Sequence, residues 1–312
     1  MKKPMKNVMI SLAAVVGLAW NVWASASVEI TEAYQKRPGS GVVDCTYTVS
    51  ASEGVKCTVL IKVGAKGCNK TVVLTNKNVT AGTVTTSIDV RTLLGKAYPN
   101  VTLFAELSNL AVQLWKDGPY WASCNLGADK PEDSGYYFWW GGTVGYKRDP
   151  SNKKWVSAAD PNATVEFRDA AGTVSGYPDD LEAAGYIDYR GNLTSAHDAA
   201  TECLGSPWRM PTSAEVQALV DNCEAHWAVV DGVSGCFVNG KGAYSSNSIF
   251  LPAAGRGYYD DLIDGGSKGY YWSSTPKPDS TEATYVIGFD SSKFERSFEL
   301  RKSFGNSVRP VQ

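Results

Sequence analysis

Apolar and polar residues alternate from residue 43 to residue 50, and again, apart from Leu60, from residue 55 to residue 63. A period of two residues is typical of strands that bury one face. The short polar segment Ala51-Ser52-Glu53-Gly54 separates the two runs. This pattern predicts an antiparallel hairpin.

Shorter β-like runs follow at residues 71–74, 84–90 and 101–107, separated by Gly, Asn and Pro. Several short strands at such spacing are typical of a sandwich of two sheets. We therefore expect residues 27–111 to form an all-β, immunoglobulin-like sandwich.

A different pattern begins near residue 112. Val112-Gln113-Leu114-Trp115, a turn at 116–119 and Tyr120-Trp121-Ala122 predict a hairpin that opens a second domain, residues 112–312. Beyond it, residues 143–192 are polar and weakly periodic, which predicts a long loop region. Strand patterns return at residues 285–289, 294–300 and 307–311.

Two helices are expected in this second domain. Thr212 and Glu215 have the spacing of a capping box, and apolar residues follow at helical spacing as far as Cys223. A shorter helix is expected from Ala196 to about Leu204, with Ser195 as its cap.

The first 26 residues have the pattern of a secretory signal peptide. Basic residues precede the apolar stretch Val8 to Trp20, and Ala24-Ser25-Ala26 has the small side chains of a cleavage site. The alternative is a membrane anchor, but this stretch would span only about 20 Å as a helix, short of the ~30 Å hydrocarbon core. We expect cleavage after Ala26, a mature chain without a membrane span, and a secreted or cell-surface location.

The balance of charges argues against a ligand that is attracted by a large net charge on the protein. Thirty basic and 32 acidic residues leave a formal net charge of -2. No nucleic acid is expected as a partner on this ground.

Seven cysteines in an exported chain favour disulfides, with at least one thiol left over. Cys223 follows the expected second helix and Cys236 lies in a strand after it, so we predict this pair to form a disulfide. No C-x-x-C pair occurs and there are only two histidines, which argues against a zinc site.

Five stretches between residues 118 and 311 share their order and spacing with a known family. They are Gly118-Pro119-Tyr120-Trp121-Ala122-Ser123-Cys124-Asn125-Leu126-Gly127-Ala128 continuing to Tyr136-Tyr137-Phe138-Trp139-Trp140-Gly141; Trp208-Arg209-Met210-Pro211-Thr212; Asn247-Ser248-Ile249-Phe250-Leu251-Pro252-Ala253-Ala254-Gly255; Gly269-Tyr270-Tyr271-Trp272-Ser273-Ser274; and Ser307-Val308-Arg309-Pro310-Val311. Together they resemble the Fibrobacter succinogenes major paralogous domain and its relatives.

The resemblance implies an α+β fold similar to C-type lectins and formylglycine-generating enzymes, with a mixed antiparallel sheet, two helices and long loops. It implies that residues 112–115 pair with residues 307–311. Some similar domains are hypervariable targets of diversity-generating retroelements, with ligand-facing residues near the C-terminus, so the same role is an expectation here.

Candidate ligand-binding residues occur in two places. Tyr258, Tyr259, Asp260 and Asp261 combine aromatic faces with carboxylates, the mixture that a sugar needs; the alternative is a loop whose tyrosines pack on the domain. The second set lies on and beside the strand 294–301, as its exposed face, with an ordinary solvated strand as the alternative. Its members are Lys293, Glu295, Ser297, Glu299, Arg301 and Lys302.

The aromatic block at residues 136–140 is interpreted as core rather than as a binding surface. Calcium is not expected, because the spacing around Asp260 places Leu262 and Tyr271 where oxygen ligands would be needed. No other cofactor is implied.

Catalysis is not expected, because neither His197 nor His226 lies near a recognisable nucleophile motif. The sequence thus predicts an exported, non-enzymatic protein that binds an extracellular carbohydrate or protein. The alternative is a structural envelope protein without a specific ligand.

Overall fold

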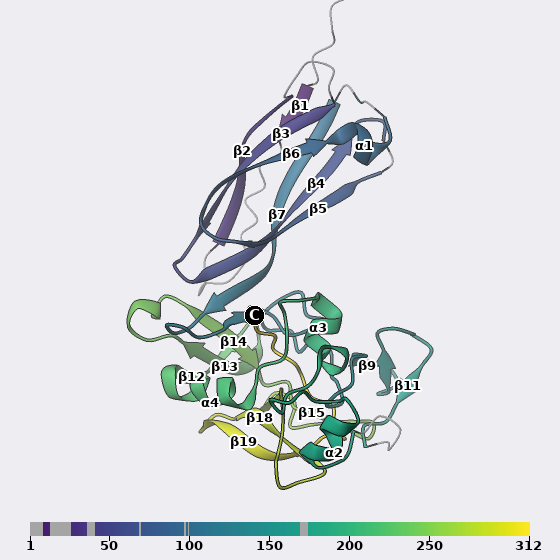
Figure 1. Ribbon diagram of the computed structural model, residues 1–312, viewed down its shortest axis with the longest axis vertical. Coiled ribbons are helices and arrows are strands. Elements are labelled where there is room, and N and C mark those ends of the chain that lie inside the picture. The colour runs from purple at the N-terminus through teal and green to yellow at the C-terminus, as the bar shows by residue number, and fades with distance from the viewer. Residues whose placement is uncertain are drawn as a thin grey trace, which may run out of the picture. The chain divides into compact units, whose positions relative to one another are not determined.

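The computed structural model describes residues 9–12, 26–35, 41–68, 70–96, 98, 100–168 and 174–312, without the side chains of residues 9–12, 108, 109 and 297–299. The chain divides into two compact units, Met1–Leu110 and Ala111–Gln312 (Figure 1). Of the expected signal peptide, only Met9–Leu12 (β1) and Ala26 are among the described residues. No helix in the described ranges is both long and apolar enough to cross a membrane.

Two sheets make up the first unit (Figure 1). One has the order β2-β3-β6 and the other β1-β7-β4-β5, and a short helix, α1, follows β6. Their bounds are β2 Ala26–Gln35, β3 Val42–Ala51, β4 Val55–Ala65, β5 Val72–Val79, β6 Gly82–Asp89, α1 Val90–Leu94 and β7 Asn100–Gln113. The apolar faces of β3 and β4 are buried, as their alternation predicted. A hydrogen bond of 2.9 Å from Asn76 Nδ2 to the Tyr47 hydroxyl links the two sheets.

The predicted hairpin of residues 42–63 is wrong. β3 pairs with β2 and β6, whereas β4 lies in the other sheet between β7 and β5. Alternation shows which face of a strand is buried but does not show which strand lies beside it. The polar turn therefore carries the chain from one sheet to the other.

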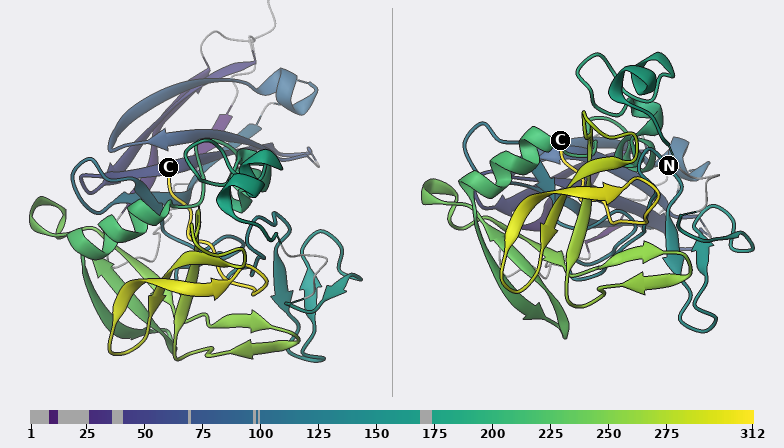
Figure 2. Two further views of the ribbon diagram at one scale, coloured as in Figure 1. Left: turned by 60° about the horizontal axis from the view of Figure 1, so that its bottom comes forward. Right: turned by 90° about the horizontal axis from the view of Figure 1, so that it is seen from below.

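The second unit consists of short strands with three α-helices among its described residues (Figures 1 and 2). Its sheets have the orders β11-β10-β9, β12-β13-β14, β15-β16 and β17-β18-β19, and β8 pairs with the end of β7. The strands are β8 Tyr120–Ala122, β9 Tyr146–Arg148, β10 Trp155–Ser157, β11 Thr164–Val165, β12 Glu224–Val230, β13 Val233–Asn239, β14 Ser248–Pro252, β15 Arg256–Tyr258, β16 Asp261–Ile263, β17 Gly269–Pro276, β18 Ala283–Phe289 and β19 Phe294–Arg301; the helices are α2 Pro178–Ala183, α3 Ala199–Leu204 and α4 Ser213–Asn222.

The expected α+β, C-type-lectin-like fold is wrong for this chain. Among the described residues strand far exceeds helix, the strands form many small sheets, and the α-helices have only five to ten residues. Glycines and turns interrupt the apolar runs before they can extend into one larger sheet. Residues 143–192 are also not a plain loop, because they contain β9, β10, β11 and α2.

The C-terminal segment pairs with a different partner from the one expected. The hairpin at residue 112 is confirmed, since Val112 pairs with Trp121. Because β7 occupies one edge of β8, residues 310–312 bond to the other edge, and the Tyr120 amide donates to the Gln312 carbonyl at 3.0 Å. Val311 also forms a bridge with Arg209.

The helix α4 begins as predicted. Thr212 Oγ1 accepts from the Glu215 amide at 3.2 Å, and the Thr212 amide donates to Glu215 Oε2 at 2.8 Å. The predicted cap of the shorter helix is wrong, because Ser195 lies in a separate 3-10 turn and Asp198 caps α3. The 3-10 turn ends at His197, before α3 begins, and Asp198 Oδ1 accepts the amides of Ala200 and Thr201 at 2.9 and 3.0 Å.

Most of the aromatic block at residues 136–140 is core, as predicted. Phe138 and Trp140 pack with Trp272 in one cluster, while Tyr137 and Trp139 belong to a second cluster around Phe167. Adjacent residues point to opposite sides of an extended chain, so this segment joins two cores.

A fully buried arginine holds the C-terminal segment against two other parts of the second unit, residues 122–125 and Phe250. The guanidinium of Arg309 donates to Asn125 Oδ1 and to the carbonyls of Ala122, Ser123 and Phe250 at 2.5–3.0 Å. Burial lowers the pKa of this guanidinium. All of these acceptors are neutral, so hydrogen bonds alone compensate the buried charge.

The predicted disulfide between Cys223 and Cys236 is absent, and both are buried free thiols. Cys236 lies opposite Trp227 in the β12–β13 pair. Cys223 is four positions before Trp227, which corresponds to about 13 Å along a strand. A disulfide needs Cα atoms within about 7 Å, so the register keeps this pair apart.

Candidate functional site

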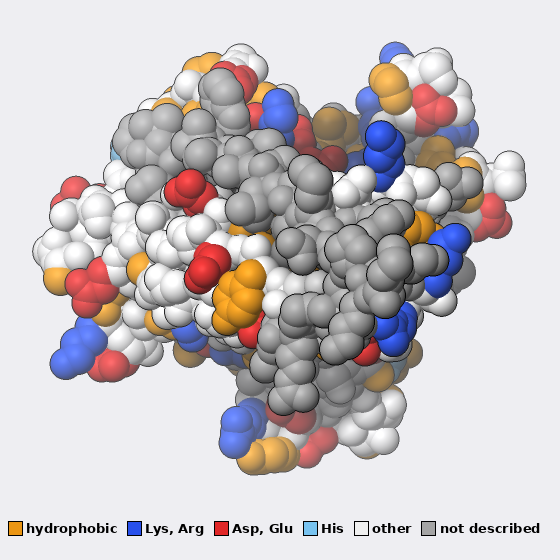
Figure 3. Space-filling model, turned by 90° about the horizontal axis from the view of Figure 1, so that it is seen from above, with side chains coloured by type: hydrophobic (Ala, Val, Ile, Leu, Met, Phe, Trp, Pro, Cys, Tyr) orange, Lys and Arg blue, Asp and Glu red, His pale blue; other side chains and the backbone are white. Residues whose placement is uncertain are grey.

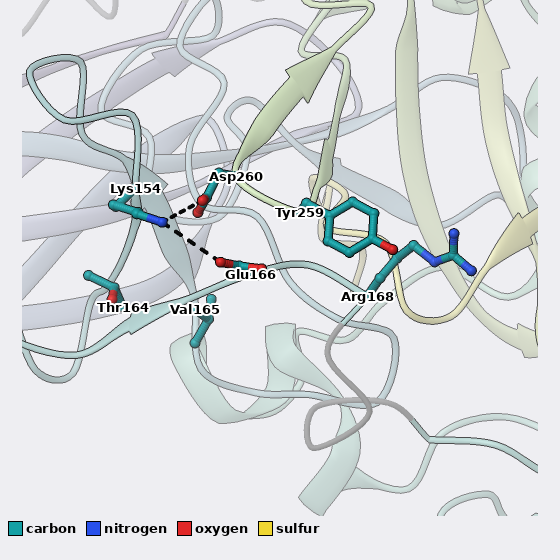
Figure 4. Close-up of a pocket in the computed structure, with 7 residues that line it drawn as sticks. All are labelled: Lys154, Thr164, Val165, Glu166, Arg168, Tyr259 and Asp260. Carbon is teal, nitrogen blue, oxygen red and sulfur yellow. Dashed lines mark hydrogen bonds and ion pairs between the residues drawn. The ribbon is translucent and has the colours of Figure 1, made fainter.

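A cavity of about 350 Å³ opens between the β10–β11 segment and the residues that follow β15 (Figure 4). We call it the Tyr259 cavity. It contains two of the predicted ligand-binding residues, Tyr259 and Asp260. Its lining consists of Lys154, Thr164, Val165, Glu166, Arg168, Tyr259 and Asp260.

Phe167 anchors the wall of the Tyr259 cavity from behind. Its buried ring packs at 5.0–5.9 Å from the rings of three other aromatic residues, which are Trp139, Tyr146 and Trp155. Gly257 and Gly305 lie against this ring, and a Cβ at either position would come within 2.3 Å of it. Glycine is required at both positions for the ring to fit.

Two residues beside this anchor hold unusual backbone conformations. Arg168 has φ of +85° and Tyr259 has φ of +52°. The Phe167 amide donates to the Tyr259 carbonyl at 3.1 Å, and the Tyr259 amide donates to the Phe167 carbonyl at 2.6 Å. The Arg168 amide donates to the Ser303 carbonyl at 2.7 Å. Positive φ in residues other than glycine is strained, and such strain gathers at binding sites.

Arg168 and the two tyrosines form one end of the site. The guanidinium donates to the Tyr258 hydroxyl at 2.9 Å, and its carbon lies 5.4 Å and 5.8 Å from the ring centres of Tyr258 and Tyr259. The two tyrosine rings meet edge to face at 4.7 Å. Tyr259 nevertheless stays 46% exposed, so part of its ring is open to a ligand.

Charged side chains form the other end. Lys154 Nζ donates to Asp260 Oδ2 and lies 3.7 Å from Glu166 Oε1, and the hydrogen bond with Asp260 raises the pKa of Lys154. Arg148 Nε donates to the Asp260 carbonyl at 2.8 Å. Asp260 Oδ1 is buried and has no hydrogen-bond partner among the described residues. A buried acceptor without a donor is costly, which favours a ligand that supplies one.

Three lining residues with charged side chains were missed by the sequence interpretation, namely Lys154, Glu166 and Arg168. They lie in the region predicted as a plain loop. The alternation from Thr164 to Arg168, with Phe167 buried between two polar residues, was the available signal for a short edge strand.

The remaining predicted ligand-binding residues lie outside the lining of the Tyr259 cavity. Tyr258 supports Tyr259, and Asp261 is exposed with Arg148 Nη2 at 3.5 Å. Lys293 pairs with Glu295 at 2.7 Å, and Arg301 pairs with Glu282 at 3.2 Å. The side chains of Ser297 and Glu299 are outside the described part of the chain.

Lys302 was predicted to be exposed, and this is wrong. The residue is fully buried, and its Nζ donates to the carbonyls of Gly176 and Thr281 at 3.2 and 3.1 Å and lies 4.8 Å from the Trp140 ring centre. Because β19 ends at Arg301, the alternation of exposed and buried positions does not continue to Lys302. Burial lowers its pKa to about 8.

A second cavity of about 400 Å³ lies around the segment from Arg209 to Thr212. The main polar side chains of this second cavity already form hydrogen bonds with other groups of the chain. The buried carboxylate of Asp198 accepts the amides of α3 and of Met210, and Arg209 forms two hydrogen bonds with Glu215 at 2.5 and 2.7 Å. We therefore favour the Tyr259 cavity as the binding site.

Metal binding has no support in the described ranges, where no three His, Cys, Asp or Glu side chains gather in a way that could hold an ion. Charge is mixed as well: on the face shown in Figure 3, acidic and basic side chains lie interspersed. The Tyr259 cavity offers one tyrosine ring, two carboxylates, one ammonium group and one guanidinium. Comparison of the chain with protein-family models, with curated proteins and with solved structures found no match.

Proposed function

We propose that this chain is an exported binding protein that holds an extracellular carbohydrate in the Tyr259 cavity. One observation carries the proposal. A half-exposed tyrosine ring with a strained backbone stands at the mouth of a cavity lined by two carboxylates, Asp260 and Glu166.

The chemistry of a sugar matches this arrangement. The CH groups on one face of a sugar ring pack on an aromatic face, and its hydroxyls donate to carboxylates. Asp260 Oδ1 would gain a donor on binding. The hydrogen bonds to Phe167 hold the backbone of Tyr259 and the edge-to-face contact with Tyr258 holds its ring before the ligand arrives, which reduces the entropy lost on binding.

The export pattern at residues 1–26 supports an extracellular ligand. A protein ligand recognised by Lys293, Glu295 and Arg301 has less support, because each of these side chains already has an ion-pair partner.

The test is a saccharide array probed with the mature chain, followed by calorimetry on the best binder. Tyr259→Ala should weaken binding about 10-fold, since an aromatic contact contributes roughly 0.5–1.5 kcal/mol beyond its buried area. Its melting temperature should match that of the wild type because the ring is partly exposed. Tyr34→Ala is the matched control, as Tyr34 is 47% exposed and belongs to the first unit.

Two outcomes would overturn the proposal. If the wild-type chain binds no saccharide, a structural envelope role replaces it. If Tyr259→Ala and Tyr34→Ala bind equally well, the cavity is not the binding site.

A further inference from the structure

The charges around the Tyr259 cavity are not evenly compensated. Lys154 contacts two carboxylates, those of Asp260 and Glu166. Arg168 forms no ion pair within 4 Å among the described residues, and its polar side-chain contact there is with the neutral hydroxyl of Tyr258. The charge of Glu282 acts on Arg168 as well, but that carboxylate forms its ion pair with Arg301 at 3.2 Å. Among the described residues, the cavity thus has one cation in an ion pair and one that is in none.

The two cations lie at opposite ends of the site. Figure 4 shows the ring of Tyr259 between the guanidinium of Arg168 and the group formed by Lys154, Asp260 and Glu166. A ligand ring against Tyr259 would therefore have a carboxylate-rich environment on one side and a guanidinium on the other.

The guanidinium of Arg168 is also held in place. Two tyrosine rings pack against it, and its backbone is fixed by the bond to Ser303. A guanidinium has five N–H donors, and the bond to Tyr258 uses one of them. The rest match the two oxygens of a carboxylate or sulfate, which arginine binds in a bidentate manner.

We propose that the saccharide in the Tyr259 cavity is acidic, with the carboxylate or sulfate ester of its ring bound by Arg168. This inference rests on the proposed function and adds the charge of the ligand. A carboxylate presents two oxygens and a sulfate ester three, two of which can accept in the same way, so the test must distinguish them.

Calorimetry with matched oligosaccharides tests the inference on the mature chain. For galactose and for glucose, the probes are the neutral oligosaccharide, the uronate and the sulfated form. Arg168→Gln should weaken binding of one acidic form about 10- to 100-fold, the effect of losing a charge-assisted hydrogen-bond pair. The wild type should bind the acidic form more tightly than the neutral form, and Arg168→Gln should remove most of that preference.

Arg190→Gln is the matched control. Arg190 donates to the Tyr189 hydroxyl at 2.8 Å and lies 5.2 Å from that ring centre, the same arrangement outside the Tyr259 cavity. This variant should bind all probes as the wild type does. Raising the salt concentration should weaken binding of the acidic probe and leave the neutral probe unaffected.

The possible failures are distinguishable. If Arg168→Gln binds acidic and neutral probes with wild-type affinity while Tyr259→Ala loses binding, the ligand is a neutral saccharide and only this inference is overturned. If no probe binds the wild-type chain, the proposed function is overturned as well. If Arg168→Gln weakens binding of the uronate alone, the group bound by Arg168 is a carboxylate. If it weakens binding of the sulfated form alone, the group is a sulfate ester.

Discussion

Replacement of Gly257 by alanine tests how the Tyr259 cavity is built. The new Cβ would lie 2.3 Å from Cδ2 of Phe167, whereas carbon atoms pack at about 3.5–4.0 Å. The ring has no room to move, because aromatic neighbours surround it and Gly305 lies against it as well. Forcing one group to shift by more than about 1 Å is overpacking, which costs roughly 1–3 kcal/mol.

The cost should appear in thermal unfolding followed by circular dichroism. For a unit of about 200 residues, 1 kcal/mol corresponds to about 2–4 °C, so Gly257→Ala should lower the melting temperature by about 3–10 °C. Binding should weaken as well, since a shift of Phe167 would disturb the hydrogen bonds between its backbone and that of Tyr259.

Gly142→Ala is the control for this experiment, because its Cβ would meet nothing closer than an ordinary contact of 3.4 Å. If the two alanine variants melt within about 1 °C of each other, the packing argument is refuted. In a Phe167→Leu background, Gly257→Ala should lower the melting temperature by less than it does in the wild type. If the effects of the two substitutions are strictly additive, the packing argument is also refuted.

Three further predictions concern protonation and thiols. Burial favours the neutral acid of Glu215, but the hydrogen bonds from Arg209 and its charge outweigh this and lower the pKa of Glu215. The ionised form therefore stabilises the fold above the unfolded pKa, and this stability should be lost as pH falls from about 5 to 3. Glu215→Gln should reduce that loss. Lys302 has a pKa of about 8 in the folded chain and about 10.4 in the unfolded chain. The free energy of unfolding, measured with urea, should therefore rise by roughly 1–2 kcal/mol between pH 8 and 10. Lys302→Met should abolish this rise. The exposed thiol of Cys203 should react with maleimide in the folded chain, whereas Cys223, whose pKa burial raises to about 12, should react only after unfolding.

Each of these has a contradicting result. Parallel acid-unfolding curves for the wild type and Glu215→Gln would show that the ion pair adds nothing. A flat stability profile from pH 8 to 10 would mean that the carbonyls around Lys302 compensate its burial. Equal labelling of both thiols in the folded chain, read by peptide mass, would place Cys223 at the surface.

Local patterns predicted some of the local structure, although the cap at Ser195 and the hairpin of residues 42–63 were wrong. The capping box of Thr212 and Glu215 depends on residues three positions apart, and the structure contains it. Tyr259 and Asp260 were identified because they are adjacent and carry the required chemistry. In both cases the relevant physics acts within one turn of chain.

Non-local features were not predictable in the same way. Arg168 lies about 90 residues from Tyr258, and only the packing of Phe167 brings them together. The separation of Cys223 from Cys236 depends on strand register, which neither residue encodes. Lys302 is buried because a strand ends one residue earlier, and strand ends are set by the surrounding packing.

The position of Arg309 also has a consequence for the order of events during synthesis. Its guanidinium binds residues 122–125 and Phe250, which leave the ribosome long before it does. The second unit therefore cannot complete its core while its last residues are still untranslated. The oxygens of Asn125 and Phe250 therefore stay without this donor until residue 309 has been added to the chain.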